Sequence, residues 1–236
     1  MSRRHVSKIK RSKTDDLGIA ILACENSQKS KSYIPNYLLS TIDGQSIVEH
    51  QSNIIKKVYS NNCIYIVTGY GCDKIVDLLP KSMRIVENQN FQTSGPAEYL
   101  RLLINNSSES GILFIDGNLM FPEDVLLDFD FASSFLVCVE EECNQQDIGV
   151  TISNGCVNQL SFGLKIKTHN MFFLRDFELR LAEKICRNRD KNKLLLFEIL
   201  NYVINNGGII KQHKPKVKHS IKKIETAKDL YEGNDI

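Results

Sequence analysis

The chain has 236 residues, of which 42% are hydrophobic and 25% are charged, and its formal net charge is +2 at pH 7. This composition predicts a globular protein with a substantial core and excludes a disordered or fibrous chain. A net charge so near zero gives no strong case for nucleic acid as the main partner. No apolar run approaches the about 20 residues that a membrane-spanning helix needs, so we expect no membrane partner.

The cysteines and the first residues indicate the compartment. Seven cysteines occur without a C-x-x-C pair. Cys24, Cys63 and Cys138 lie inside apolar runs, which favours buried free thiols in a reducing compartment over metal binding. The start of the chain lacks the apolar segment of a secretory signal. We therefore expect a cytoplasmic protein.

Two regions differ in character along the chain. Residues 1–16 are basic and lack periodicity, which predicts a flexible arm that either contacts phosphates or remains a solvated tail. Residues 17–236 show no internal repeat and no linker, so we expect a single domain there.

Apolar runs alternate with helical patterns in the first half of this domain. Strands are expected at 17–23, 63–68, 83–87 and 111–116, and helices at 46–59, 73–79, 96–104 and 122–127. Ser46 and Glu49 form a capping-box pattern at the first helix. This alternation predicts a parallel sheet with helices on both faces. Because ligands bind beyond the carboxyl ends of such strands, function is expected in the loops after Ala23, Thr68 and Ile115.

The second half has a different pattern. Strands are expected at 134–140, 149–153, 157–162, 164–173 and 209–217, helices at 177–186 and 194–205, and a closing helical turn at 227–231. Asn154-Gly155 is a strong signal for a hairpin turn. The predicted fold class is therefore α/β: a mixed, mostly parallel central sheet flanked by helices, with a β-hairpin insertion and helices near the C-terminus.

Several short motifs occur in a fixed order after the arm. They lie at 35–39, 44–50, 67–70, 88–97, 116–121 and 224–230, and they include Val67-Thr68-Gly69-Tyr70 and Asp116-Gly117-Asn118. Together they resemble the motifs of the nucleotidyltransferases that join a nucleoside triphosphate to a sugar phosphate or phosphocholine. The resemblance covers nearly the whole chain after the arm and implies the nucleotide-diphospho-sugar transferase-like fold.

The resemblance also implies a reaction and its partners. A nucleoside triphosphate would transfer its nucleotidyl group to a phosphorylated small molecule and release pyrophosphate, with Mg²⁺ as cofactor. The implied nucleotide-binding residues are Ala23, Cys24, Glu25, Thr68, Gly69, Gln92, Gly95, Pro96 and Ala97. The implied acceptor-binding residues are Tyr70, Lys165 and Lys167. The sequence leaves homo-oligomer formation open.

The implied catalytic residues are Lys29, Lys31 and Asp116, and the implied metal ligands are Asp116, Asn118 and Glu225. Each set departs from the family pattern. Residues 24–31 lack the glycines that let backbone N–H groups approach phosphates. The same segment lacks the family arginine, and Lys29 or Lys31 would supply the positive charge in its place. Asn36 stands where the family has a phosphate-binding lysine. Asn118 matches an aspartate, and Asp116-Gly117-Asn118 also suits an ordinary turn.

These departures leave three functions open. The first is an active nucleotidyltransferase, and the second is a catalytically inactive relative that binds ligands or supports an assembly. The third is a glycosyltransferase of similar architecture, for which Asp128-Phe129-Asp130 provides a D-x-D pattern. His5, His50 and His169 have no visible acidic partner, so no catalytic role is assigned to them.

Overall fold

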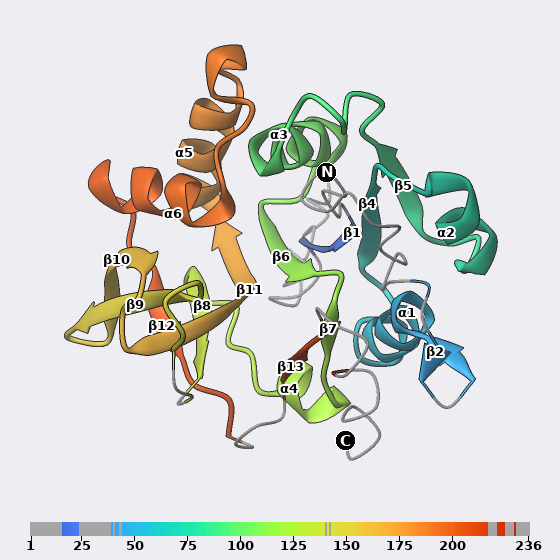
Figure 1. Ribbon diagram of the computed structural model, residues 1–236, viewed down its shortest axis with the longest axis horizontal. Helices are drawn as coiled ribbons and strands as arrows, with labels where there is room; N and C mark the ends of the chain where they lie inside the picture. The colour runs from blue at the N-terminus through green and yellow to red at the C-terminus, as the bar shows by residue number, and fades with distance from the viewer. Residues whose placement is uncertain are drawn as a thin grey trace, which may run out of the picture.

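The computed structural model describes residues 16–23, 39, 41–42, 44–139, 141, 143–216, 221–224 and 229 (Figure 1). A nine-stranded mixed sheet forms the centre of this part of the chain, in the order β5-β4-β1-β6-β11-β8-β12-β10-β9. The predicted basic arm and the closing helical turn at 227–231 lie outside the described residues, apart from residues 16 and 229.

One half of the sheet is parallel. It contains β5 (Arg84–Glu87), β4 (Cys63–Thr68), β1 (Leu17–Ala23) and β6 (Gly111–Asp116). Ala23 pairs with Thr68 and Leu22 pairs with Asp116, so these three strands end level with one another. The predicted convergence of Ala23, Thr68 and Asp116 at one sheet edge is therefore confirmed.

The other half of the sheet is mainly antiparallel. It contains β8 (Phe135–Val139), β9 (Ile148–Ser153), β10 (Cys156–Phe162), β11 (Ile166–Arg175) and β12 (Lys211–His213). Because β9 also pairs with β11, strand pairing runs in a closed ring through β11, β8, β12, β10 and β9. Asn154 and Gly155 join β9 to β10 with φ values of 51° and 75°, which confirms the predicted hairpin turn.

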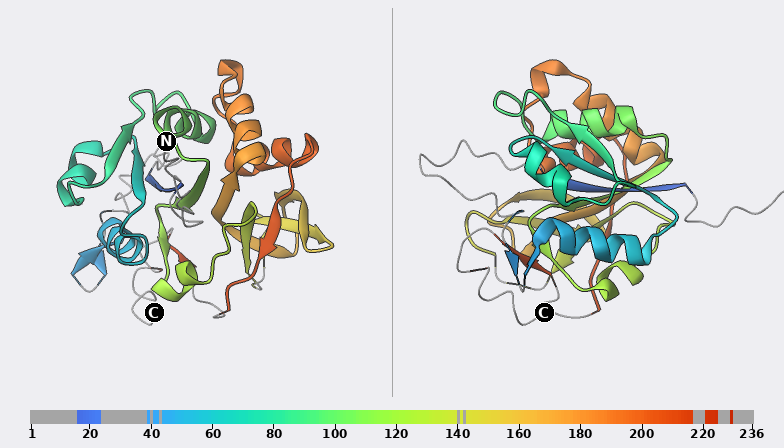
Figure 2. Two further views of the ribbon diagram at one scale, coloured as in Figure 1. Left: turned by 180° about the vertical axis from the view of Figure 1, so that it is seen from behind. Right: turned by 90° about the vertical axis from the view of Figure 1, so that its right-hand side faces the viewer.

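Helices cover both faces of the sheet, as the alternating pattern predicted (Figure 2). One hydrophobic cluster includes residues of α1 (Ile47–Val58), α2 (Cys72–Leu78) and α4 (Glu123–Leu127). A second cluster includes residues of α3 (Pro96–Asn106), α5 (Asp176–Cys186) and α6 (Leu196–Asn205). The short elements are β2 (Thr41–Ile42), β3 (Gln45–Ser46), β7 (Leu119–Met120), η3 (Arg189–Lys191) and β13 (Lys222–Lys223).

Two predictions need correction. Within the described residues, the strand expected at 209–217 spans Lys211–His213, and Pro215 beyond it has no N–H to offer a neighbouring strand. Cys63 is half-buried rather than buried, since it begins β4 near the sheet border. Cys138 is buried as predicted, and burial raises its pKa to about 12. The six cysteines in the described residues are all free thiols.

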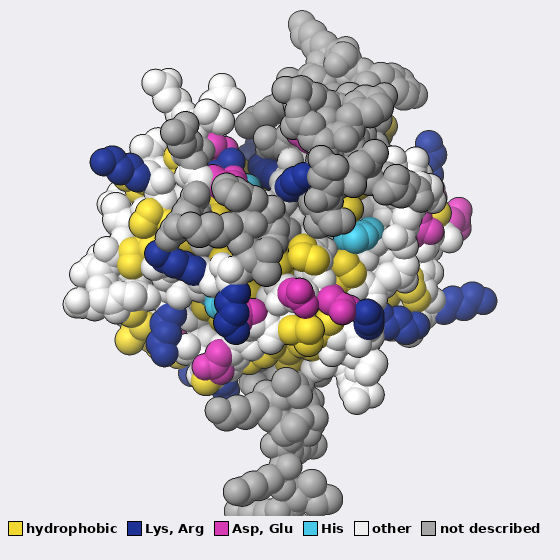
Figure 3. Space-filling view, turned by 90° about the horizontal axis from the view of Figure 1, so that it is seen from below, with side chains coloured by type: hydrophobic (Ala, Val, Ile, Leu, Met, Phe, Trp, Pro, Cys, Tyr) yellow, Lys and Arg dark blue, Asp and Glu magenta, His cyan; other side chains and the backbone are white. Residues whose placement is uncertain are grey.

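No helix in the described residues is long and apolar enough to cross a membrane. The surface charges are mixed in sign. Figure 3 shows positive and negative side chains interspersed over the described part of the face seen from below. For example, Glu123 at the start of α4 pairs with Lys57 at 2.5 Å, and Asp128 just after α4 pairs with Lys216.

The capping box at the start of α1 gives a first test. The Ser46 hydroxyl accepts a hydrogen bond from Glu49 N at 3.3 Å, and Ser46 N donates to the Glu49 carboxylate at 3.0 Å. Ser46→Ala should lower the free energy of unfolding by about 1 kcal/mol, because it removes the cap of the helix. Urea denaturation measures the change. Ser60→Ala, at an exposed serine just beyond the same helix, is the control, and equal stabilities of the two variants would contradict the role of the cap.

Candidate functional site

A cavity of about 1120 Å³ opens where the parallel half of the sheet meets β11. Leu22 and Asp116 line it from the carboxyl ends of β1 and β6. Lys167 and Asn170 line it from β11, and residues of α3, α6 and the loop before β9 complete its walls. The cavity therefore lies at the sheet edge where the sequence predicted a ligand.

Asp116 is held at this edge from three directions. Asn170 Nδ2 donates a hydrogen bond of 3.1 Å to the Asp116 carboxylate. The buried Gln51 amide donates from α1 to Asp116 O at 3.0 Å and to Leu119 O at 2.7 Å. Leu22 O accepts from Gly117 N at 3.0 Å. The carboxylate is half-buried, and its residue is part of the cavity wall.

Asn118 lies in the turn that follows β6. Because β6 ends at Asp116, Asp116-Gly117-Asn118 begins the ordinary turn that these residue types also suited. Asn118 is absent from the described residues that line the cavity, and its buried Oδ1 accepts no hydrogen bond from any of the described residues. Asn118 O accepts from Ile224 N at 2.9 Å, which brings the C-terminal segment to this turn.

Carboxylate and amide oxygens are the ligands that Mg²⁺ prefers. Asp116, at the cavity wall, and the Asn118 Oδ1, which has no hydrogen-bond donor in the described part of the chain, fit that preference in chemical type. Glu225 follows Ile224 in sequence and lies outside the described residues. The described residues contain no group of three or more His, Cys, Asp or Glu side chains that could hold a metal ion. The magnesium site thus stays a prediction.

The structure describes only the start of the segment 23–31, which was predicted to bind the triphosphate. Ala23 ends β1 and is buried. Cys24, Glu25, Lys29 and Lys31 lie outside the described residues, as does Asn36. Their predicted contacts with a triphosphate stay predictions.

The end of β4 supports the loop around residues 88–95. Thr68 is buried, and its hydroxyl donates to Cys72 Sγ at 3.0 Å. A Cβ at Gly69 would lie 2.8 Å from Phe91 Cβ, so glycine allows Phe91 to pack there. Tyr70 is exposed and contacts the Phe91 ring edge-on, with centroids 6.2 Å apart. These contacts give Thr68, Gly69 and Tyr70 structural roles, and none of the three is among the described residues that line the cavity.

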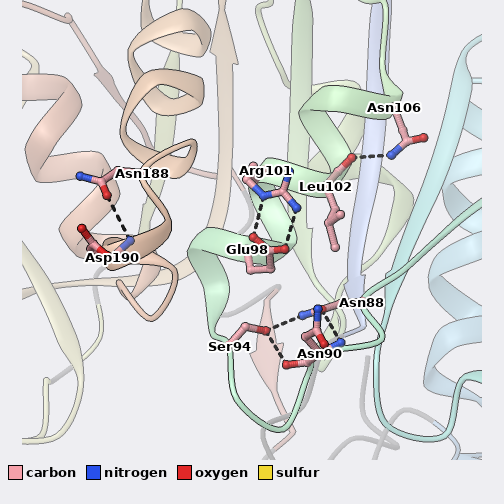
Figure 4. Close-up of polar contacts among 9 residues, drawn as sticks. All are labelled: Asn88, Asn90, Ser94, Glu98, Arg101, Leu102, Asn106, Asn188 and Asp190. Carbon is pink, nitrogen blue, oxygen red and sulfur yellow. Dashed lines mark hydrogen bonds and ion pairs between the residues drawn. The ribbon is translucent and has the colours of Figure 1, made fainter.

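Hydrogen bonds fix the loop that carries the predicted nucleotide-binding residue Gln92 (Figure 4). The buried Asn88 donates to Ser94 Oγ at 2.8 Å and accepts from Asn90 N at 3.0 Å. The exposed Gln92 lies on this loop, between Asn90 and Ser94. The loop ends at Pro96, which begins α3 and lines the cavity.

The next segment of the chain contacts the start of α3. Gly95 N donates to Asn192 O at 2.9 Å, and Ala97 N donates to Leu194 O at 3.2 Å. The N–H groups of these two predicted nucleotide-binding residues are thus hydrogen bonded within the chain. The stretch from η3 to α6 closes this side of the cavity, and Leu195 at its end lines the cavity wall.

The two predicted acceptor lysines lie in different places. Lys165 is exposed and lines a second, smaller hollow. Lys167 lines the main cavity, where its ammonium lies 3.4 Å from the Asp147 carboxylate and 3.6 Å from that of Glu141. Two carboxylates therefore offset the charge of Lys167.

A buried histidine beside Lys167 has an acidic partner that the sequence did not reveal. His169 is 3% exposed and lines the cavity, and its Nε2 lies 3.5 Å from Glu141 Oε2. This separation is longer than that of a typical hydrogen bond. Pairing of β8 with β11 brings the two residues together although 28 positions separate them in sequence. The His50 Nε2, in contrast, lies 3.2 Å from the Phe121 carbonyl oxygen.

The fold is that of solved nucleotidyltransferases. The inositol-1-phosphate CTP transferase from T. maritima is 15% identical over 92% of this chain and 94% of its own, with a TM-score of 0.72. The CTP:phosphocholine cytidylyltransferase from Streptococcus pneumoniae is 19% identical over 93% and 98%, with a TM-score of 0.73. A nucleoside-diphosphate-sugar pyrophosphorylase from Vibrio cholerae is 15% identical over 92% and 99%, with a TM-score of 0.70.

No model of a known protein family matches the sequence, and no curated protein does. The likeness in structure confirms the predicted nucleotide-diphospho-sugar transferase-like fold. At such low identities it shows shared architecture, and activity has to be argued from the site.

The Glu141–His169 pair predicts a change in stability with pH. The nearby His169 imidazole, with a smaller contribution from Lys167, holds the pKa of Glu141 below its ordinary value of 4.5. A depressed pKa means that the charged carboxylate stabilises the folded state above pH 4.5 and that this stabilisation is lost as the pH falls through the lower folded pKa. Glu141→Gln should therefore lose less stability on acidification than the wild type.

Urea denaturation at neutral pH and at several values below 4.5 measures this difference. Glu183→Gln is the control, because Glu183 pairs with Arg187 on the surface of α5. Parallel acid profiles for the wild type and Glu141→Gln would contradict the assignment.

Proposed function

We propose that the protein transfers a nucleotidyl group from a nucleoside triphosphate to a phosphorylated small molecule and releases pyrophosphate. The observation that carries the proposal is the placement of Asp116 at the end of β6, on the wall of a cavity of about 1120 Å³. The fold supports it, because proteins that share this architecture are a CTP transferase, a cytidylyltransferase and a sugar pyrophosphorylase.

In such a reaction the protein mainly positions its substrates and neutralises their charge. Bound Mg²⁺ would supply positive charge to the phosphates, and Asp116, Asn118 and Glu225 would hold it. Lys29 or Lys31 would add a cation beside the triphosphate. The rigid loop that carries Gln92 would face the base, at the α3 side of the cavity.

The acceptor would enter from the β11 side. Lys167 and His169 line the cavity there, and Glu141 and Asp147 lie close to them. This arrangement orients an acceptor through hydrogen bonds rather than through a free cationic charge, because the Lys167 ammonium already has two carboxylate partners.

A catalytically inactive relative that binds a ligand is the second candidate. Specific observations favour it: Asn118 brings no negative charge, and the N–H groups of Gly95 and Ala97 already bond to residues 192 and 194. Such a protein would bind a nucleotide without turnover. A ligand at 100 times its dissociation constant would still raise the stability by about 2.7 kcal/mol.

Pyrophosphate release tests the first candidate. The four common nucleoside triphosphates are each combined with inositol 1-phosphate, phosphocholine or glucose 1-phosphate in the presence of Mg²⁺ or Mn²⁺. At least one pair should release pyrophosphate, and Asp116→Asn should slow that release by about 100-fold or more, because it removes the carboxylate that faces the reacting phosphates.

Asp130→Asn is the matched control. Asp130 is exposed on the loop after α4, and it belongs to the D-x-D pattern that a glycosyltransferase would use. Unchanged activity in this variant excludes that pattern from the site. Thermal stabilisation by a triphosphate without pyrophosphate release from any pair would reject the enzyme and support the inactive relative.

A further inference from the structure

Asn170 occupies an irregular point in β11. Between Thr168 and Phe172 this strand advances four residues, whereas its neighbour β8 advances two, from Cys138 to Leu136. The extra residues form a bulge, and Asn170 there has a φ of 53°. This left-handed conformation is unfavourable for most side chains, and asparagine tolerates it better than nearly all others except glycine.

The bulge places Asn170 opposite the end of β6. Met171 pairs with Ile115 in the antiparallel register, so the preceding residue of β11 lies across from Asp116. Asn170 Nδ2 donates its hydrogen bond of 3.1 Å to Asp116 Oδ2, and both residues line the cavity. Bulges beside functional sites often redirect a single side chain in this way.

The backbone of Asp116 is fixed independently of its carboxylate. Gln51, which is 0% exposed, donates to the carbonyl groups on either side of the turn, those of Asp116 and Leu119. With the backbone held by Gln51, the orientation of the carboxylate depends on its own side-chain torsions. The Asn170 amide restricts those torsions from the opposite strand.

From this geometry we infer that Asn170 is a positioning residue, which orients the Asp116 carboxylate toward the cavity for metal-assisted chemistry. The inference rests on the proposed function, since it assigns the orienting contact of the carboxylate that the proposed reaction uses. Partners that orient a ligating carboxylate typically affect metal affinity or activity by about 10-fold to 100-fold.

Asn170→Gly tests this role, because glycine keeps the left-handed backbone and removes the amide. Asn154→Gly is the matched control, since Asn154 has a φ of 51° in the β9–β10 hairpin. Mn²⁺ affinity, measured by electron paramagnetic resonance, should weaken about 10-fold or more in Asn170→Gly and stay unchanged in Asn154→Gly. In turnover, kcat should fall while KM for the triphosphate stays within error, and the melting temperatures of both variants should stay close to that of the wild type.

A second readout needs neither metal nor turnover. The side-chain amide resonance of Asn170 in the NMR spectrum of the wild type should shift in Asp116→Ala, because that change removes its acceptor. The inference would be overturned if Asn170→Gly kept the Mn²⁺ affinity of the wild type. It would also be overturned if the chemical shift of the Asn170 side-chain amide were unchanged in Asp116→Ala. Absence of both Mn²⁺ binding and turnover in the wild type would instead reject the proposed function, and the resonance would still decide whether Asn170 holds Asp116.

Discussion

The buried amide of Gln51 links α1 to the turn that follows β6, and the placement of the candidate site depends on this link. Its side-chain N–H groups donate to the carbonyls of Asp116 and Leu119, and the side chain is 0% exposed. A buried carbonyl that loses its donor costs about 1–3 kcal/mol. The turn is therefore rigid, and the residues on either side of it are held in fixed positions.

From this turn the chain brings together segments that are distant in sequence. β7 continues from the turn and pairs with β13, so the C-terminal segment reaches the carbonyl of Asn118. On the other side, Gly117 N bonds to Leu22 O at the end of β1. One short turn thus contacts α1, β1 and the segment 221–224, which explains why polar groups from these elements meet at a single sheet edge.

Much of the fold was predictable from local patterns. The bounds of β1, β4 and β6 match the prediction because each of these strands is a continuous apolar run between polar loops. Asn154-Gly155 identified its hairpin because few residue pairs adopt two successive positive φ values. The order of the motifs identified the fold, and through it the sheet edge on which Asp116 lies.

Contacts that depend on strand register were not predictable. Glu141 and His169 meet only because β8 pairs with β11, and the alternation of residues in a strand does not say which side chains face each other across a sheet. For the same reason the sequence did not reveal that two carboxylates lie close to Lys167, a predicted acceptor-binding residue. The bulge at Asn170 has no clear sequence signal, since asparagine is also common in turns.

The central claim is that the cavity beside Asp116 holds the triphosphate end of a nucleotide together with a divalent metal ion. A crystal structure with a non-hydrolysable nucleoside triphosphate and Mn²⁺ measures this directly, because the anomalous signal of manganese locates the ion. The account predicts an anomalous peak beside the Asp116 carboxylate and a base beside the loop that carries Gln92. An ordered nucleotide bound elsewhere, or a cavity that stays empty at saturating nucleotide, would contradict it.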